Sequence, residues 1–241
     1  MNVYSKIEKD LKSLKNPLKI KIFKRFFKTG PGEYGEGDQF LGLTMPQQRL
    51  IAQKFYKQVK LDDLDKLIKS PIHEYRMTGL LILTYQYCEA NDENKKNIYQ
   101  YYLNNKDRIN NWDLIDVTCP KIVGEYLWFH QRDLKVIDRL IKSENLWDRR
   151  IAVMATYSFI RRGQFYPFLN FAKILLTDKR DLINKVVGWM LREIGKKDLK
   201  ALLNFLDINY QQMPRTMLRY SLEKLNPTQK DFYMGRTKAR R

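Results

Sequence analysis

Apolar residues recur every three or four positions along most of the chain, as they do on one face of an α-helix. The first such stripe comprises Val3, Ile7, Leu11 and Leu14. The same pattern predicts further helices over about 17–28, 46–59, 62–70, 72–90, 94–104, 112–129, 132–143, 147–162, 165–176, 181–196, 198–209 and 215–225. Because no segment shows convincing strand alternation, the pattern predicts an all-α protein.

Short turns join the predicted helices, and paired helices of about 10–18 residues are typical of an α-solenoid. The length fits about five or six antiparallel pairs, with a compact helical bundle as the alternative. Pro120 lies inside the predicted helix 112–129 and predicts a kink or a break there. The periodicity ends at Pro227, and residues 227–241 contain five Lys or Arg and one acid. We therefore expect one domain over 1–226, followed by a flexible basic tail over 227–241.

Positive charge dominates the composition, with 45 Lys and Arg against 27 Asp and Glu and a net charge of +18. This excess indicates nucleic acid or an anionic membrane surface as a partner, although charge can also serve solubility alone. No apolar run reaches the ~18 residues of a membrane span, and Met1–Lys15 lacks a signal peptide's apolar core. Cys88 and Cys119 lie in apolar helical patterns and predict buried free thiols. Together these features predict a cytoplasmic protein.

The segment Leu11–Gly32 contains no acid and supplies a cationic helix face. The cations on that face are Lys21, Lys24, Arg25 and Lys28, and the opposite half holds Leu18, Ile22, Phe23, Phe26 and Phe27. We expect the phenylalanines to pack inward and the cations to meet phosphates of nucleic acid. A membrane-surface helix and a merely solvated face are the alternatives.

Two other motifs carry little chemistry. The stretch Gly30–Gly37 contains a literal G-x-G-x-x-G, but no strand precedes it, Pro31 lacks an N–H, and its two glutamates would repel phosphate. We interpret it as a tight surface loop. His73 and His130 are remote from each other and from both cysteines, so the sequence predicts neither a metal site nor a cofactor.

Three tryptophans lie close to charged residues at helical spacing. The pairs are Trp112 with Asp116, Trp147 with Arg150, and Trp189 with Arg192. Spacings of three and four residues share one helical face. Since the pairs are separated by roughly one helical repeat of about 35–45 residues, stacked repeats would direct them to one surface. Indoles, guanidinium groups and a carboxylate there could bind a polyanion and stabilise a cation that develops beside it.

Each of these residues also has an ordinary interpretation. Asp116 can lie on a solvated face or act as a local cap. Arg150 and Arg192 can form salt bridges with neighbouring acids. Trp147 is better interpreted as core packing, and Asp113 in the first helical turn complements the helix dipole.

Five stretches resemble the AlkD-like family of alkylpurine DNA glycosylases. They are Arg25–Gly30, Phe40–Leu43, Asn111–Asp116, Leu146–Ala152 and Gly188–Glu193, and the resemblance spans about Leu18 to Leu225. Members are built from HEAT-like helical repeats with a concave, basic DNA-binding face, so the resemblance implies an α-solenoid of this kind. The order and spacing of the five stretches, rather than any one motif, make the match to this family specific.

The resemblance also implies roles for individual residues. Trp112, Asp116 and Trp189 would form the lesion-facing cleft, and Arg150 and Arg192 would hold the DNA backbone. Further candidate phosphate contacts are Lys185, Arg149, Lys28 and Arg25. Some relatives lack the tryptophan and the aspartate and are thought non-catalytic, whereas this chain has both. Family members act without a pocket that encloses the base.

This set of residues suits one reaction. Alkylation at N7 of guanine or N3 of adenine makes the base cationic, so it leaves as a neutral molecule without a general acid. A carboxylate such as Asp116 would stabilise the oxocarbenium ion and orient water. We therefore expect a monomeric, monofunctional glycosylase that acts on alkylated purines in double-stranded DNA. The alternatives are a non-catalytic α-solenoid that binds branched or damaged DNA, and a protein-binding solenoid.

Overall fold

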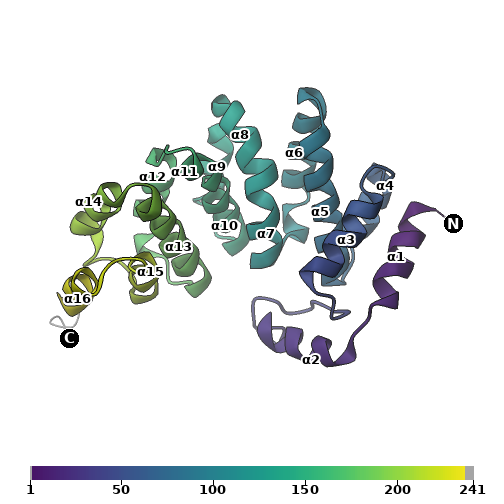
Figure 1. Ribbon diagram of the computed structural model, residues 1–241, viewed down its shortest axis with the longest axis horizontal. Coiled ribbons are helices and arrows are strands. Elements are labelled where there is room, and N and C mark those ends of the chain that lie inside the picture. The colour runs from purple at the N-terminus through teal and green to yellow at the C-terminus, as the bar shows by residue number, and fades with distance from the viewer. Residues whose placement is uncertain (1, 237–241) are drawn as a thin grey trace. The chain divides into compact units, whose positions relative to one another are not determined.

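The computed structural model describes residues 2–236, and within this range every regular element is helical (Figure 1). The only strand-like feature among these residues is an isolated bridge between Gln39 and Ile72. The all-α prediction is therefore confirmed. None of the helices in this range is long and apolar enough to cross a membrane.

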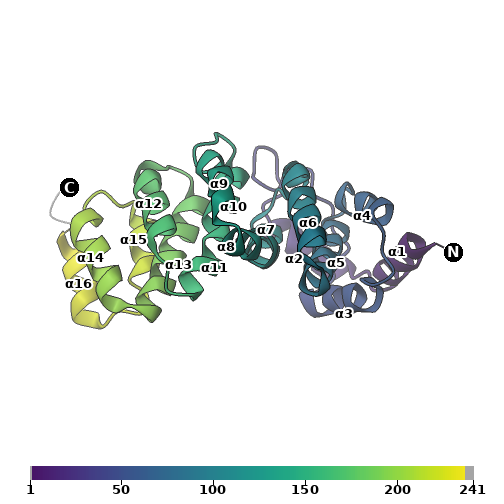
Figure 2. The ribbon, with the colours of Figure 1, turned by 90° about the horizontal axis from the view of Figure 1, so that it is seen from above.

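The chain divides into two compact units, Met1–Tyr126 and Leu127–Arg241. The first contains α1 (Val3–Ser13), α2 (Pro17–Phe26), α3 (Met45–Phe55), α4 (Leu61–Ile68), α5 (His73–Glu89), α6 (Asp92–Asn104) and α7 (Trp112–Cys119). Helix α5 lies at its centre, in contact with α3, α4 and α7 (Figure 1 and Figure 2). Most side chains of α5 are buried, which makes this helix the core of the unit.

The second unit begins within α8 (Glu125–Phe129). It continues with α9 (Lys135–Leu140), α10 (Leu146–Ala155), α11 (Tyr157–Arg161), α12 (Tyr166–Ile174), α13 (Asp181–Lys197), α14 (Leu199–Asn209), α15 (Arg215–Ser221) and α16 (Pro227–Arg236). Helix α13 packs against α10, α14 and α15 and supplies much of this unit's core. The predicted single domain over 1–226 and the repeat count stay predictions.

Polar caps explain where many of the helices begin. Side chains at the N-cap accept backbone N–H groups at the starts of α1, α2, α6, α7, α10 and α14, from Asn2, Asn16, Asn91, Asn111, Asn145 and Asp198. Each cap satisfies a donor that has no partner inside the helix. The predicted helix starts were accordingly close to the observed ones.

Pro120 interrupts the predicted helix 112–129, as the sequence indicated. Residues Pro120–Gly124 form a π-helical turn between α7 and α8. Proline lacks an N–H, and its ring clashes with the carbonyl one turn earlier, so the α-helical bond cannot form there. The wider turn continues the helix direction at a local cost in hydrogen bonding.

The C-terminal segment differs from its prediction. Residues Pro227–Arg236 form α16 rather than a flexible arm. The side chain of Tyr233 is buried, and its hydroxyl donates to Asp207 Oδ1 at 2.7 Å. This anchor orders the helix although its apolar periodicity is weak. The remaining basic residues of the predicted tail, 237–241, lie outside the described residues.

Two burial predictions were wrong. Helix α2 has no buried residue, and of the phenylalanines that were expected to pack inward only Phe27, just beyond its end, is buried. Cys88 is exposed, whereas Cys119 is buried as predicted. In both cases the apolar pattern identified a helix correctly but not which neighbours would cover its face.

Gly188 allows close approach of two helices in the second unit. A β-carbon there would lie 2.6 Å from Tyr220 Cβ and closer still to the Met217 carbonyl oxygen. We expect Gly188→Ala to push α15 from α13 and to lower the free energy of unfolding by about 1–3 kcal/mol. Urea denaturation measures this change. The control is Gly235→Ala, because a β-carbon there would meet no described atom within 4 Å outside its chain neighbours and its own helix backbone. An equal loss in both variants would contradict the packing argument.

Candidate active site

Trp112 and Asp116 share one face of α7. Helix α7 begins at Trp112, whose backbone N–H donates to the Asn111 side chain at 2.8 Å. Asp116 follows one turn later, and both side chains are half-buried. Burial, and then the negative charge of Asp116, raise the pKa of the Cys119 thiol well above its ordinary value. Cys119 therefore stays protonated and is not a nucleophile.

The indole of Trp112 is held by an aromatic stack from the segment after α2. Its ring stacks on Phe27 with centroids 5.5 Å apart and meets the edge of Phe26 at 5.6 Å. Phe27 in turn stacks on Phe40 at 5.2 Å, and Phe40 stacks on the imidazole of His73 at 4.9 Å. One side of the indole is thus fixed by protein, which leaves its exposed part with a defined orientation.

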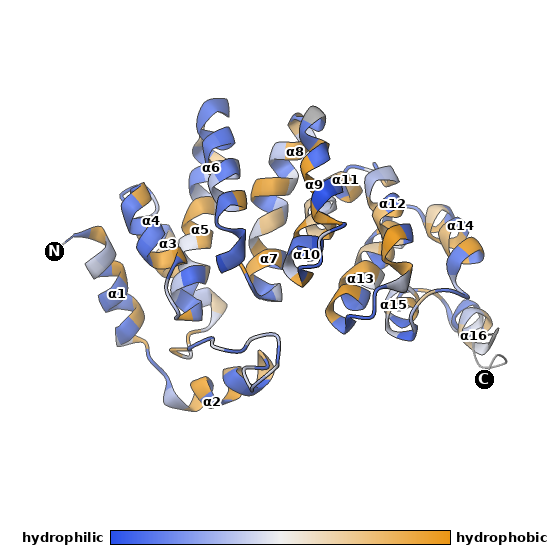
Figure 3. Cartoon of the chain, turned by 180° about the vertical axis from the view of Figure 1, so that it is seen from behind, coloured by the Kyte–Doolittle hydropathy of each residue, from blue (hydrophilic) through white to orange (hydrophobic). Residues whose placement is uncertain are grey.

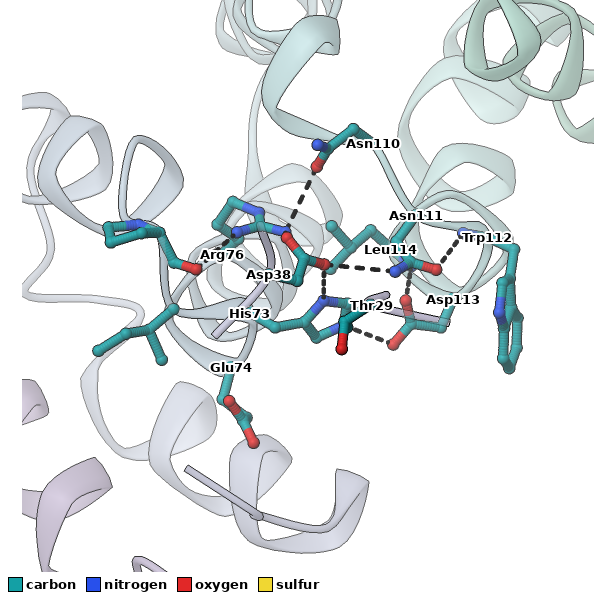
Figure 4. Close-up of polar contacts among 12 residues, drawn as sticks. Thr29, Asp38, His73, Glu74, Arg76, Asn110, Asn111, Trp112, Asp113 and Leu114 are labelled. Atoms are coloured by element: carbon teal, nitrogen blue, oxygen red, sulfur yellow. Dashed lines mark hydrogen bonds and ion pairs between the residues drawn. The ribbon is translucent and has the colours of Figure 1, made fainter. Parts of the chain in front are cut away.

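A buried polar network fixes the first turn of α7 (Figure 4). His73 bridges two carboxylates, with Nδ1 3.0 Å from Asp38 Oδ2 and Nε2 2.9 Å from Asp113 Oδ2. Arg76 donates to Asp38 Oδ1 at 2.6 Å, and Asn111 donates to Asp38 Oδ2 at 3.3 Å. Through Asp113 and Asn111, this network ties α5 and the loop before α3 to the residues on either side of Trp112.

The charges in this network balance. Burial by itself disfavours the imidazolium, but the negative charge and hydrogen bond of Asp113, with the bond to Asp38, outweigh it and raise the pKa of His73 to about 9. Burial likewise opposes ionisation of Asp38, but the hydrogen bond to His73 and the charge of Arg76 lower its pKa. At neutral pH His73 is therefore protonated and, together with Arg76, compensates the buried carboxylate of Asp38 beneath the start of α7.

Glu74, next to His73 on α5, points the other way and organises the loop before α3 (Figure 4). Its carboxylate is buried and accepts the backbone N–H groups of Leu41, Gly42 and Leu43 at 2.9, 2.7 and 3.2 Å. Gly42 has a φ of +86°, which suits glycine. Glu74 thus fixes the segment that presents Phe40 to the aromatic stack.

The Gly30–Gly37 segment is a tight loop with mostly exposed residues, as predicted. Its amides are used internally: Gly30 N–H donates to Glu33 Oε2 at 2.8 Å, and Gly32 N–H donates to Glu36 Oε2 at 2.9 Å. The N–H of Gly35 donates to the Lys28 carbonyl at 2.9 Å. Since the loop's own carboxylates occupy the N–H groups of Gly30 and Gly32, and a backbone carbonyl occupies that of Gly35, these donors are not available to cradle a phosphate.

In the second unit, Trp189 and Arg192 lie on α13. The indole N–H of Trp189 donates to Glu193 Oε1 at 3.0 Å. Arg192 forms ion pairs with Glu223 and, at 3.6 Å, with Glu193. The salt-bridge interpretation of Arg192 is therefore confirmed in this structure, and its contact with phosphate stays a prediction.

The other predicted cations differ in availability. Arg150 is only 4% exposed and donates to the Leu182 carbonyl at 2.7 Å, which gives it a structural role. Arg149 pairs with Asp178 at 2.9 Å, and Lys185 pairs with Asp181 at 2.7 Å. Lys28 pairs weakly with Glu33 at 4.0 Å, and both Lys28 and Arg25 are exposed. Arg25 on α2 and Lys28 just beyond its end are thus the most accessible of the predicted phosphate contacts, and binding of phosphate by any of these cations stays a prediction.

The structure brings together Trp112 with Asp116 in the first unit and Trp189 with Arg192 in the second. A family model for "DNA alkylation repair enzyme" matches residues 7–225. The chain belongs to the DNA alkylation repair enzyme family. The resemblance to the AlkD-like family is thereby confirmed, and DNA alkylation repair is the process in which the protein acts.

Solved structures agree with this family assignment at the level of the fold. A predicted DNA alkylation repair enzyme from Enterococcus faecalis is 17% identical with a TM-score of 0.69, over 88% of this chain and 97% of that one. AlkD2 from Streptococcus mutans is 19% identical with a TM-score of 0.55, over 86% and 99%. The smu.31 protein of the same species is 21% identical with a TM-score of 0.53, over 75% and 92%. No curated protein matches the chain.

Sequence reasoning missed three residues that support the candidate site of this DNA alkylation repair family member. Asp38, His73 and Arg76 carry the network under α7, yet His73 was interpreted only as a remote, isolated histidine. The available signal was the group His73, Glu74 and Arg76 at the start of an apolar helix. Charged residues on a helix that the core must bury require partners, so such a group indicates a buried network.

Proposed function

We propose that this protein is a monofunctional DNA glycosylase that hydrolyses the N-glycosidic bond of cationic N3- or N7-alkylated purines in double-stranded DNA. The observation that carries the proposal is the pair of Trp112 and Asp116 on a helix start held by a buried network. Family membership supplies the repair context. The protein would act as a monomer built from HEAT-like helical repeats.

The reaction requires few catalytic groups from the protein, because the alkylated base is already a good leaving group. The bond between C1′ and the purine nitrogen breaks, its electron pair leaves with the base, and the base departs neutral. Water then adds to C1′ and loses a proton. The Asp116 carboxylate stabilises the oxocarbenium character of the sugar and orients that water. The indole of Trp112 adds cation–π contacts to the charged base or sugar, and a contact of Trp189 with the substrate stays a prediction.

A helix start with fixed geometry matters because the carboxylate acts only if it already faces the developing charge. The network at Asp113 and Asn111 removes freedom from the turn that bears Trp112 and, one turn on, Asp116. No reorganisation of α7 is then needed when the sugar becomes cationic.

Incubation of the wild-type protein with methylated duplex DNA, followed by chromatography of the released bases, tests the proposal. We expect free 7-methylguanine or 3-methyladenine together with an equal amount of abasic sites. Tight binding to the same DNA without release of any base would contradict it and favour the non-catalytic DNA-binding alternative.

DNA affinity should depend strongly on salt. If about five phosphates are contacted, log K should fall against log salt with a slope near −4.5. Fluorescence anisotropy with a labelled duplex over a range of salt concentrations measures the slope. A flat dependence would instead favour a solenoid that binds proteins.

A further inference from the structure

Helix α2 presents an exposed apolar stripe. Leu18, Ile22 and Phe26 follow one another at intervals of four residues and are 75%, 63% and 58% exposed. No residue of α2 itself is buried, and apolar and polar residues alternate along it in Figure 3. Single exposed apolar side chains are common, but three in a row on one helix face mark an interaction surface.

The charges around this stripe select an anionic partner. Lys21, Lys24 and Arg25 are exposed on the same short helix. No acid occurs between Leu11 and Gly32, and the first turn of α2 carries none. The partner must therefore combine negative charge with apolar surface, as duplex DNA and an anionic lipid surface both do.

The way in which α2 is attached to its unit favours duplex DNA over a lipid surface as the partner. Its last residue, Phe26, meets the edge of the Trp112 indole at 5.6 Å, so the stripe ends at the candidate active site. The helix is held at both ends: Asn16 N–H donates to the Leu41 carbonyl at 2.8 Å, and Phe23 meets the edge of Phe40 at 6.0 Å. In Figure 1, α2 lies crosswise below the other helices of its unit. A duplex positioned at Trp112 would be next to this fixed stripe.

We propose that Leu18, Ile22 and Phe26, the α2 ridge, pack against deoxyribose and base edges of the duplex beside the lesion, while Lys21, Lys24 and Arg25 hold the flanking phosphates. Apolar side chains that press on sugars or enter between base steps are an established way to distort DNA locally. The inference rests on the proposed function only in taking duplex DNA as the substrate.

The test separates the ridge from the cations. Because Leu18 and Ile22 are exposed, the double variant Leu18→Gln/Ile22→Gln should keep the thermal unfolding curve of the wild type. We expect it to bind duplex DNA about tenfold more weakly by anisotropy, with an unchanged salt slope, since no phosphate contact is lost. The variant Lys21→Gln/Lys24→Gln should instead make the slope shallower by about 1.8.

Ile208→Gln is the matched control, because Ile208 is equally exposed on α14 in the other unit, and its DNA affinity should equal the wild type's. Wild-type affinity in the ridge variant would overturn the inference. So would a loss of binding to phosphatidylserine vesicles with DNA affinity intact, which would identify a lipid surface as the partner. Since binding rather than excision is measured, a failure of the glycosylase proposal leaves this result interpretable.

Discussion

Asp116→Asn should reduce excision of 7-methylguanine by about 10²–10³-fold or more, with the DNA affinity nearly unchanged. The substitution keeps the shape of the side chain and removes its negative charge. Binding depends mostly on phosphate contacts, whereas stabilisation of the oxocarbenium ion depends on this charge. Single-turnover kinetics on a duplex with one 7-methylguanine gives the rate, and anisotropy on the same duplex gives the affinity.

Asp107→Asn is the control for this experiment. Asp107 is exposed in the same unit, and its substitution changes the net charge equally, so excision should proceed at the wild-type rate. A wild-type rate in Asp116→Asn would refute the catalytic role. A parallel fall in rate and affinity would indicate that Asp116 acts on the shape of the DNA-binding surface instead.

His73→Gln should strongly lower the free energy of unfolding of the first unit. The substitution leaves the buried carboxylate of Asp38 and the half-buried carboxylate of Asp113 without the cation that joins them. Breaking a buried ion pair by removing one partner costs about 3–5 kcal/mol. Urea denaturation at pH 6.5 should show a loss of this size, and excision should fall because the start of α7 is no longer held.

The loss of unfolding free energy caused by His73→Gln should become smaller as the pH rises. The pKa of His73 is raised from its ordinary value of 6.5 to about 9. A raised pKa in the folded protein stabilises it fully below pH 6.5, and the stabilisation is lost as the pH rises through about 9. The shift corresponds to about 3 kcal/mol. The gap between wild type and His73→Gln should therefore narrow by about that amount between pH 6.5 and pH 9.5.

His130→Gln serves as the comparison for this pH series. His130 is half-exposed in the loop after α8, and its substitution should change the free energy of unfolding by no more than about 0.5 kcal/mol. A gap that stays constant with pH in His73→Gln would show that the imidazole contributes through packing alone, and the charged network would lose its support.

Several features of α7 could be predicted from the sequence. The spacing of Trp112 and Asp116 predicted their shared face, and Asn111 and Pro120 indicated where the helix begins and where its regular hydrogen bonding stops. All of these depend on interactions within one or two helical turns. Helical spacing and capping depend only on residues close together in the sequence, so they can be predicted without knowing which distant segments pack nearby.

The burial of the side chains around α2 could not be predicted from the sequence. Its two-sided pattern predicted inward-facing phenylalanines, yet Phe26 is exposed and Phe23 only partly covered. A helical pattern states that one face is apolar but not what will cover it. Coverage depends on loops such as the one that Glu74 organises, whose contacts join residues more than 30 positions apart.

By itself, then, the sequence determined the all-α class, most helix boundaries, the cationic character of α2 and the placement of Trp112 one turn before Asp116. Only the tertiary structure decided that His73, Asp38 and Asp113 meet, that Arg150 is buried, and that the α2 ridge faces outward. The physical reason is one of distance along the chain. Helical spacing acts between residues three or four apart, whereas burial and charge pairing depend on which remote segments the whole chain brings together.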